Sequence, residues 1–181
     1  PKVTLNQSAT TITTTGTGSA VTFEDGMTLQ AGTYKGGTTN TDIFGTTKLS
    51  GGTLDYETQP FRPQGDFTYN SGTITGAAGG SIKFGNTGGT ARTITGSFTA
   101  PTVTFDINAA TAQTWQVGAN TVLTVTGALT MDNTNTATMT INGTGSPAGK
   151  IVAQGNIVAD STVAGNVAID LTGGNSQSIN A

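Results

Sequence analysis

The side chains best able to do chemistry in this chain are two acidic pairs, Glu24/Asp25 and Asp55/Glu57. Positions 55 and 57 are two apart, so on a strand both carboxylates lie on one face, with Cα atoms about 6.5 Å apart. Such a pair suits glycosidic or lyase chemistry, or a calcium site. The alternative is that the acids are solvated turn charges. Histidine and cysteine are absent, which excludes an imidazole base, a Ser-His-Asp triad, a thiolate nucleophile and a disulfide. We therefore expect no enzymatic activity.

A second candidate for metal binding is the run Asp132-Asn133-Thr134-Asn135, which places oxygen ligands at alternate positions. It lacks the glycine and the distal glutamate of an EF-hand loop. We expect no cofactor and interpret the run as a polar turn. A structural calcium ion is the alternative that stays open.

The best candidate binding surface comprises Tyr34, Phe44, Phe61 and Arg62, in a stretch where the alternation of polar and apolar residues is lost. That stretch, residues 31–66, also contains two prolines, and it predicts a loop-rich insertion. Aromatic faces stack on sugar rings, and a guanidinium group binds hydroxyls, so the insertion predicts carbohydrate binding. The alternative is a cluster of side chains that pins the loops to the core.

The elements that must position these residues are strands. Apolar residues alternate with Thr, Asp or Lys along most of the chain, and Gly, Asn and Ser turns separate the alternating stretches. Typical apolar pairs are Val3/Leu5, Val21/Phe23, Phe67/Tyr69, Val103/Phe105 and Leu123/Val125. Some intervals are close to 20 residues, such as Ile82 to Val103 at 21 and Val103 to Leu123 at 20. This period predicts one all-β domain over 1–181, a parallel β-solenoid of about eight to ten irregular coils. A β-sandwich is the alternative.

Threonine is the commonest residue, with 40 of 181 positions. The motif Thr-x-Thr recurs along the chain, and five of its occurrences begin at positions 73, 93, 102, 124 and 138. Outward threonines on stacked strands could order water, as in ice-binding solenoids. The intervals of 20, 9, 22 and 14 residues are too irregular for one flat rank. Threonine is therefore interpreted as a solvent-facing strand former, with ice binding as a minor alternative.

Charge and composition limit the classes of partner and the cellular locations that we expect for this chain. The net charge is −3, only 9% of residues are charged, and the seven basic residues are scattered, so we expect no nucleic-acid binding. No apolar run approaches the roughly 20 residues of a membrane helix, so no membrane span is expected. A threonine-rich, cysteine-free composition indicates an extracellular or cell-surface protein.

The middle of the chain contains the strings FTYNSGTITG (67–76), SIKF (81–84), RTITG (92–96) and TVLTVTGALT (121–130). On these strings, about residues 49–145 resemble repeats of very large secreted bacterial surface proteins. The string LSGGTL (49–54) is similar to the short glycine-threonine repeats of autotransporter passengers and filamentous-haemagglutinin-type adhesins. The family implies a right-handed parallel β-helix used as a rod or an adhesive stalk, with no fixed catalytic residues.

We therefore expect a structural protein: a segment of a surface adhesin or a subunit of a cell-surface filament. A solenoid has open ends with unpaired backbone groups, and residues 175–180 are predicted to form a strand with no evident cap. Self-association through strand edges or solenoid ends follows, while surface glycans are the alternative partner.

Overall fold

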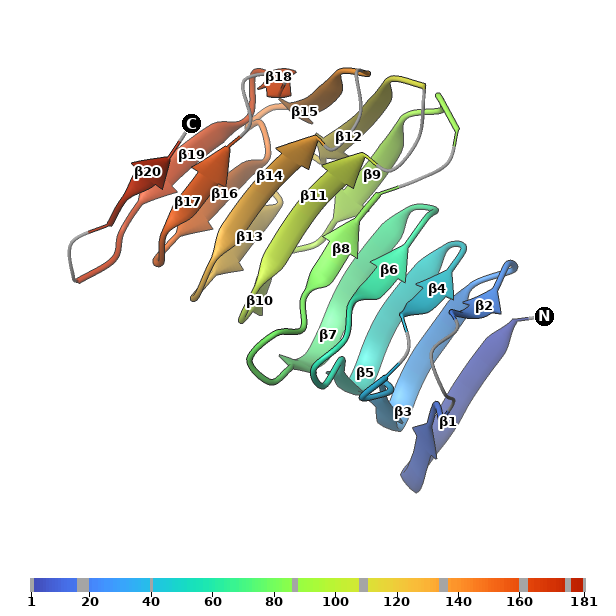
Figure 1. Cartoon of the computed structure of the whole chain (residues 1–181). Helices are drawn as coiled ribbons and strands as arrows, with labels where there is room; N and C mark the ends of the chain where they lie inside the picture. Colours follow the sequence, from blue (N-terminus) through green and yellow to red (C-terminus); the bar gives the residue numbers. More distant parts are fainter. Residues whose placement is uncertain are drawn as a thin grey trace. The chain divides into compact units, whose positions relative to one another are not determined.

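The computed structural model describes residues 2–15, 20–39, 41–85, 88–107, 111–133, 137–159, 163–174 and 177–180. The chain divides into two compact units, Pro1–Lys83 (unit 1) and Phe84–Ala181 (unit 2). Both consist of parallel strands stacked coil upon coil, and no helix occurs in these ranges (Figure 1). The prediction of an all-β parallel solenoid is therefore confirmed, and the β-sandwich alternative is wrong.

Unit 1 is built from two parallel sheets whose strands alternate along the chain. The first sheet stacks the long strands β1 (Val3–Thr13), β3 (Met27–Lys35), β5 (Thr47–Asp55) and β7 (Phe67–Thr75). The second stacks the short strands β2 (Val21–Phe23), β4 (Asp42–Phe44), β6 (Phe61–Pro63) and β8 (Ile82–Phe84). Met27 pairs with Thr47 and Thr47 with Phe67, so β3, β5 and β7 keep the 20-residue period that the sequence predicts, whereas Val3 of β1 pairs with Met27, 24 positions on.

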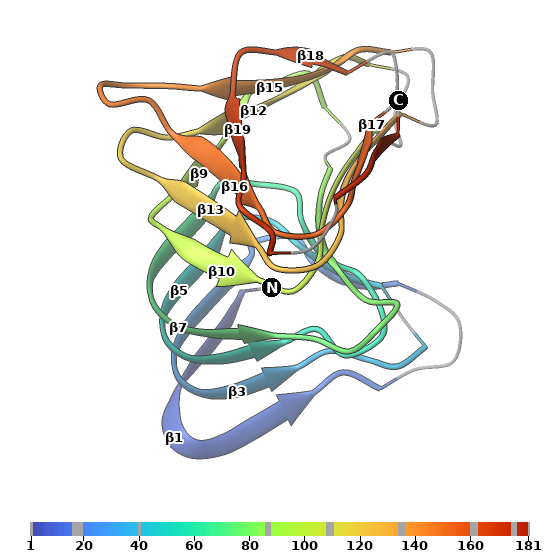
Figure 2. The same ribbon diagram turned by 90° about the vertical axis from the view of Figure 1, so that its left-hand side faces the viewer.

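The long strands of unit 1 bend part-way along their length (Figure 2). Gly32 (φ +79°) and Gly52 (φ +70°) lie at this corner in successive coils. A Cβ atom on Gly52 would lie 2.5 Å from the carbonyl oxygen of Gly32. Only glycine combines a positive φ with so close an approach of two backbones, so the corners of β3 and β5 depend on Gly32 and Gly52.

The interior of unit 1 is filled by ladders of side chains in register. Phe23 stacks on Phe44 with ring centroids 4.9 Å apart, and Phe44 stacks on Phe61 at 4.8 Å. Phe23 and Phe44 are register partners, so the rise of about 4.7–4.9 Å between neighbouring strands sets their spacing. Phe61 is in register with Asp42, and its ring reaches Phe44 diagonally. Tyr34 meets Phe44 edge-on at 5.3 Å and closes the cluster.

The prediction of a loop-rich insertion at 31–66 is wrong. This segment contains the end of β3 and all of β4, β5 and β6. The corner glycines of β3 and β5 and the inward-facing Asp42 of β4 interrupt the alternation of polar and apolar residues in the sequence, but they do not end the strands. Pro63 is tolerated because it is the last residue of β6, and the adjacent Gln64 N donates to the Phe44 carbonyl at 2.7 Å.

Unit 2 has three parallel sheets, each with four strands in the part of the chain that the structure describes. The first stacks β9 (Arg92–Thr95), β12 (Gln113–Val117), β15 (Met139–Gly143) and β18 (Val163–Gly165). The second stacks β10 (Phe98–Ala100), β13 (Val122–Val125), β16 (Lys150–Ala153) and β19 (Ala168–Leu171). The third stacks β11 (Val103–Ile107), β14 (Leu129–Asn133), β17 (Ile157–Ala159) and β20 (Ile179–Asn180).

The repeat of unit 2 is longer and less regular than the sequence spacing indicates. Val103 pairs with Leu129, 26 positions on, and Leu123 pairs with Ile151, 28 positions on. Val103 and Leu123 therefore lie in different sheets, and their interval of 20 is not a coil repeat. Trp115 is fully buried beside Phe84, with ring centroids 5.0 Å apart, as expected for a core residue.

Candidate functional site

The most unusual interior residue of unit 1 is Asp42, the first residue of β4. It shares the inward face of β4 with Phe44, and its side chain is only 2% exposed. In register it lies between Val21 of β2 and Phe61 of β6. A carboxyl group thus replaces one rung of an otherwise apolar ladder, and burying it costs free energy unless partners compensate.

The partners of Asp42 satisfy one of its two oxygens. The Thr14 hydroxyl donates to Oδ2 at 2.8 Å, and the Gly37 amide donates to the same oxygen at 3.3 Å. The other oxygen, Oδ1, is buried without a hydrogen-bond partner, and so is the hydroxyl of the fully buried Tyr34. Thr14 follows β1, so this contact ties the first coil to the second across 28 positions.

The electrostatics of this polar cluster follow from its burial. Removal from water raises the pKa of Asp42, opposed by the hydrogen bond from Thr14 and by the nearby Tyr34 hydroxyl. Burial also raises the pKa of Tyr34, and the charge of Asp42 adds to the effect. Tyr34 and Asp42 therefore lie close enough for each to shift the pKa of the other. The Tyr34 hydroxyl nevertheless makes no hydrogen bond to the carboxyl group.

A surface cavity of about 260 Å³ adjoins this cluster. Its lining combines threonine hydroxyls with one ammonium group and includes Thr14 itself: Thr13, Thr14, Thr15, Lys35, Gly36, Thr38 and Thr39. A Cβ on Gly36 would lie 3.2 Å from Asp42 Oδ2, so the missing side chain leaves room for the carboxylate. Thr14 and Gly36 therefore separate the buried carboxyl from a solvent-accessible space.

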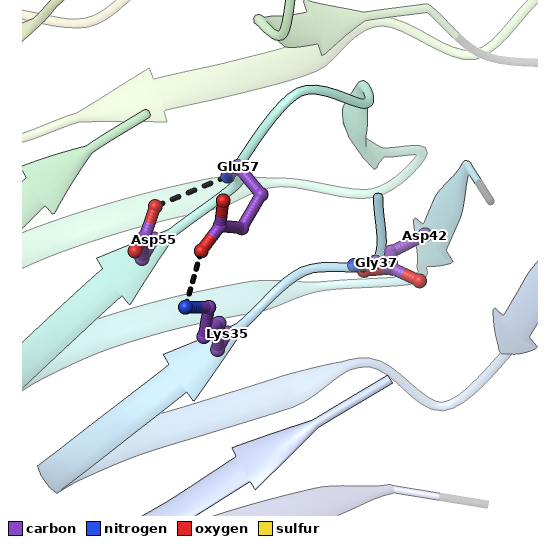
Figure 3. A network of polar contacts seen from close by, with 5 residues as sticks. All are labelled: Lys35, Gly37, Asp42, Asp55 and Glu57. Atoms are coloured by element: carbon purple, nitrogen blue, oxygen red, sulfur yellow. Dashed lines mark hydrogen bonds and ion pairs between the residues drawn. The ribbon is translucent and has the colours of Figure 1, made fainter. Parts of the chain in front are cut away.

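The acids Asp55 and Glu57 lie at the end of β5 and in the turn that follows it (Figure 3). Glu57 forms a 2.5 Å ion pair with Lys35, and its amide donates to Asp55 Oδ1 at 3.1 Å. The expectation that both acids lie on one strand face is wrong, because Glu57 is outside β5 with a φ of +49°. Both carboxylates therefore hold the turn in place.

The four residues predicted to form a binding surface are all buried. Tyr34, Phe44 and Phe61 are at most 1% exposed, and Arg62 is 9% exposed. The three rings pack on one another inside unit 1, so no ring face is available to a sugar. The open alternative, a packed cluster, describes their arrangement, and the prediction of an exposed aromatic surface is wrong.

The remaining sequence candidates have simpler positions. Glu24 and Asp25 are exposed in the turn after β2. Of the proposed calcium run, Thr134 and Asn135 lie outside the described residues, and the side chains of Asp132 and Asn133 are not described either. No group of three or more acidic side chains able to hold a metal ion occurs in the described part of the chain.

A threonine rank does exist in unit 1, although the sequence intervals argue against one. Its four members are in register in successive coils: Thr11, Thr33, Thr53 and Thr73. The neighbouring rank contains Lys35 and Asp55, so charged side chains interrupt the second row that a water-ordering plane needs. This outer face is therefore mixed in character.

Sequence reasoning missed Asp42 and Thr14. The signal was present in the triplet Asp42-Ile43-Phe44, because a residue two positions before an inward phenylalanine shares its face on a strand. Thr14 carried no signal, because its role depends on which coil lies beside it.

The final coil of unit 2 presents apolar side chains that are not covered. Leu171 pairs in register with the buried Ala153, and Ile179 with the buried Ile157, yet Leu171 is 49% and Ile179 60% exposed. An open apolar depression of about 210 Å³ lies in the same unit. It is lined mainly by Met131, Ile141, Ala159, Val163, Val167 and Ile169.

Comparison with known proteins adds no family to this description. No protein-family model, no curated protein and no solved structure matches the chain. Among the described residues there is also no helix with the length and apolar character needed to cross a membrane. The function is therefore inferred from the fold and from its exposed surfaces.

Proposed function

We propose that this chain is a structural segment of an extracellular surface protein, either an adhesin stalk or a filament subunit, that self-associates through the ends of its coil stack. The single observation that carries the proposal is the uncovered final coil of unit 2. Leu171 and Ile179 occupy ladder positions that are buried one coil earlier, at Ala153 and Ile157. These side chains need a further layer of protein to become buried.

The energetics favour covering this end. Complete burial of an apolar side chain of that size stabilises by about 1.5–3 kcal/mol. Leu171 and Ile179 are 49% and 60% exposed, so covering them contributes roughly half of that for each. The strand edges add backbone donors and acceptors that a parallel strand can pair. Only Asp170 of β19 is charged in the end strands β18, β19 and β20, and Lys150 of β16 pairs with it at 2.7 Å, so little repulsion opposes an incoming coil.

Composition and architecture support an extracellular, non-enzymatic role. Charged residues make up 9% of the chain, and threonines form an outer rank in unit 1. The acidic pair at Asp55 and Glu57 has turn-stabilising partners, and the aromatic rings proposed for sugar binding are buried. We therefore propose other copies of the chain, rather than nucleic acid or a glycan, as its main partner.

Negative-stain electron microscopy of the untagged chain over a range of concentrations tests this function. We expect regular stacked assemblies that grow with concentration. The double variant Leu171→Lys, Ile179→Lys places two charges in the uncovered end and should give discrete particles. Thr99→Lys is the matched control, because Thr99 is exposed on β10 away from that end.

Two results would contradict the proposal. Discrete wild-type particles at every concentration would show that the end does not associate. Assemblies that persist in the double variant would show that association uses another surface.

A further inference from the structure

We propose that Asp42 is a proton-operated latch for the first coil of unit 1: the neutral side chain holds the coil in place, and ionisation loosens it. The first coil here means β1, Thr14, Thr15 and β2. This inference is independent of the self-association proposed above, because it concerns an interior group.

Asp42 has apolar register neighbours in both adjacent coils. It lies in register between Val21 of the first coil and Phe61 of the third. Val21 is half-buried and Phe61 is fully buried, so the carboxyl group has apolar neighbours on both sides along the ladder. An ionised carboxylate in such surroundings is much more costly than a neutral carboxyl group.

The hydrogen bonds of Asp42 do not satisfy an ionised carboxylate. Thr14 and Gly37 both donate to Oδ2, while Oδ1 has no partner. An ionised carboxylate has acceptor sites on both oxygens, so half of its demand is unmet. Protonation removes the charge, and it supplies a donor beside the Tyr34 hydroxyl, which is also buried without a hydrogen-bond partner.

Asp42 and its chain neighbours are hydrogen-bonded to the first coil through Thr14 and Val21. The Thr14 side chain reaches Asp42 from the first coil at 2.8 Å, and the Thr14 amide donates to the Lys35 carbonyl at 3.1 Å. The Val21 amide donates to the Thr41 carbonyl at 3.0 Å, next to Asp42. Any relaxation that admits water to an ionised Asp42 therefore acts first on the contacts of Thr14 and Val21.

Water can approach Asp42 from the threonine-lined cavity. Thr14 and Gly36 line the 260 Å³ cavity and also adjoin the carboxyl group of Asp42. Displacement of one threonine side chain opens the carboxyl group to solvent. Protons can therefore exchange without unfolding of the whole unit.

The titratable and charged groups around Asp42 leave its charge without an opposite partner close by. Tyr34 of β3 faces Asp42, and the Tyr34 hydroxyl is neutral because burial keeps its pKa high. Lys35 ends β3 but pairs with Glu57, beside Asp55 (Figure 3). From β6, the nearest charged group is Arg62, which is in register with Ile43 and not with Asp42.

The sign of the pH effect follows from the direction of the shift. Burial raises the pKa of Asp42 above its ordinary value of 3.8. A carboxyl group that binds its proton more tightly when folded stabilises the folded state fully below pH 3.8. That contribution is lost as the pH rises through the raised pKa. The first coil is therefore held most firmly in acid.

Hydrogen–deuterium exchange with mass spectrometry, corrected for intrinsic rates, tests the latch between pH 4 and pH 8. We expect residues 11–15 and 21–23 to lose protection as the pH rises, by about tenfold for each pH unit of the pKa shift. Residues 47–55 of β5 serve as the internal reference. Asp42→Asn should abolish the pH dependence in the first coil, because the amide cannot ionise.

Asp170→Asn is the matched control, since Asp170 is a partly exposed acid of unit 2 and should leave the pH dependence unchanged. The proposal is overturned if the first coil of the wild type shows no pH dependence, or if Asp42→Asn retains it. If Asp42→Asn fails to fold, Thr14→Val gives the answer. Loss of protection in acid supports the latch, and unchanged protection overturns it.

Discussion

The hydroxyl of Thr14 donates a 2.8 Å hydrogen bond to Oδ2 of Asp42, 28 positions away and in the next coil. Both side chains are buried, at 7% and 2% exposure. This contact lies where the aromatic ladder, the first coil and a threonine-lined cavity meet.

The first prediction concerns Thr14. Thr14→Val keeps the shape of the side chain but removes the donor to Asp42. Loss of a buried hydrogen bond of this kind costs about 1–3 kcal/mol. We expect the loss to appear as faster amide exchange in the first coil. Thr13→Val is the control, because Thr13 is exposed at the end of β1, and an equal effect there would contradict the role of the Thr14 hydroxyl.

The second prediction concerns the aromatic cluster. Phe44→Ala removes the central ring of the stack formed with Phe23 and Phe61. A buried phenylalanine replaced by alanine costs about 3–5 kcal/mol, measured by denaturant unfolding followed by circular dichroism. Thr22→Ala on the exposed face of β2 should change little. A Phe44→Ala protein of undiminished stability that had lost glycan retention would restore the carbohydrate-binding hypothesis.

The third prediction concerns the corner of the long strands. Gly52→Ala would put a Cβ atom 2.5 Å from the Gly32 carbonyl oxygen at a φ of +70°. We expect a loss of more than about 1 kcal/mol in stability, because both the backbone conformation and the space exclude a side chain. Gly174→Ala is the matched control, since no atom lies within 4 Å of its added Cβ. Equal melting temperatures for the two variants would refute the steric argument.

The fourth prediction concerns the ion pair at the end of β3. Hydrogen bonding and attraction to Glu57 raise the pKa of Lys35 above its ordinary value of 10.5. Glu57→Gln should lower that pKa, as followed by nuclear magnetic resonance of the lysine side chain. The sign follows because a raised lysine pKa stabilises the folded state below pH 10.5 and ceases to do so as the pH rises through the higher value. Lys48, exposed on β5, is the reference lysine in the same spectra. An unchanged Lys35 pKa would show that the pair does not persist in solution.

The fold could be predicted to a considerable extent because its signal is local. Alternation in Phe67/Tyr69 and Val103/Phe105 lies on β7 and β11, as expected. The coil period was predicted well for β3, β5 and β7 of unit 1, whose paired residues are 20 positions apart. It was misjudged in unit 2, where Val103 and Leu123 belong to different sheets. Spacing along the chain does not distinguish successive coils from successive sides of one coil.

The candidate site was predicted poorly because burial depends on neighbours from other coils. Tyr34, Phe44 and Phe61 were expected on loops because the sequence around them does not alternate. In the structure Tyr34 and Phe61 both pack on Phe44, Tyr34 edge-on at 5.3 Å and Phe61 stacked at 4.8 Å. Glycines inside the long strands, such as Gly32 in β3 and Gly51 and Gly52 in β5, disrupt the pattern without ending the strand.

The sequence by itself determined that the chain forms strands and turns and not helices, because side-chain alternation and glycine placement act over a few residues. It also excluded histidine and cysteine chemistry. Only the tertiary structure decided which side chains are inside and which carboxylate is left partly unsatisfied. The reason is that each rung of a parallel stack is completed by residues about 20 or more positions away. Asp42 is an ordinary polar residue in the sequence, and stacking between Val21 and Phe61 turns it into a buried acid.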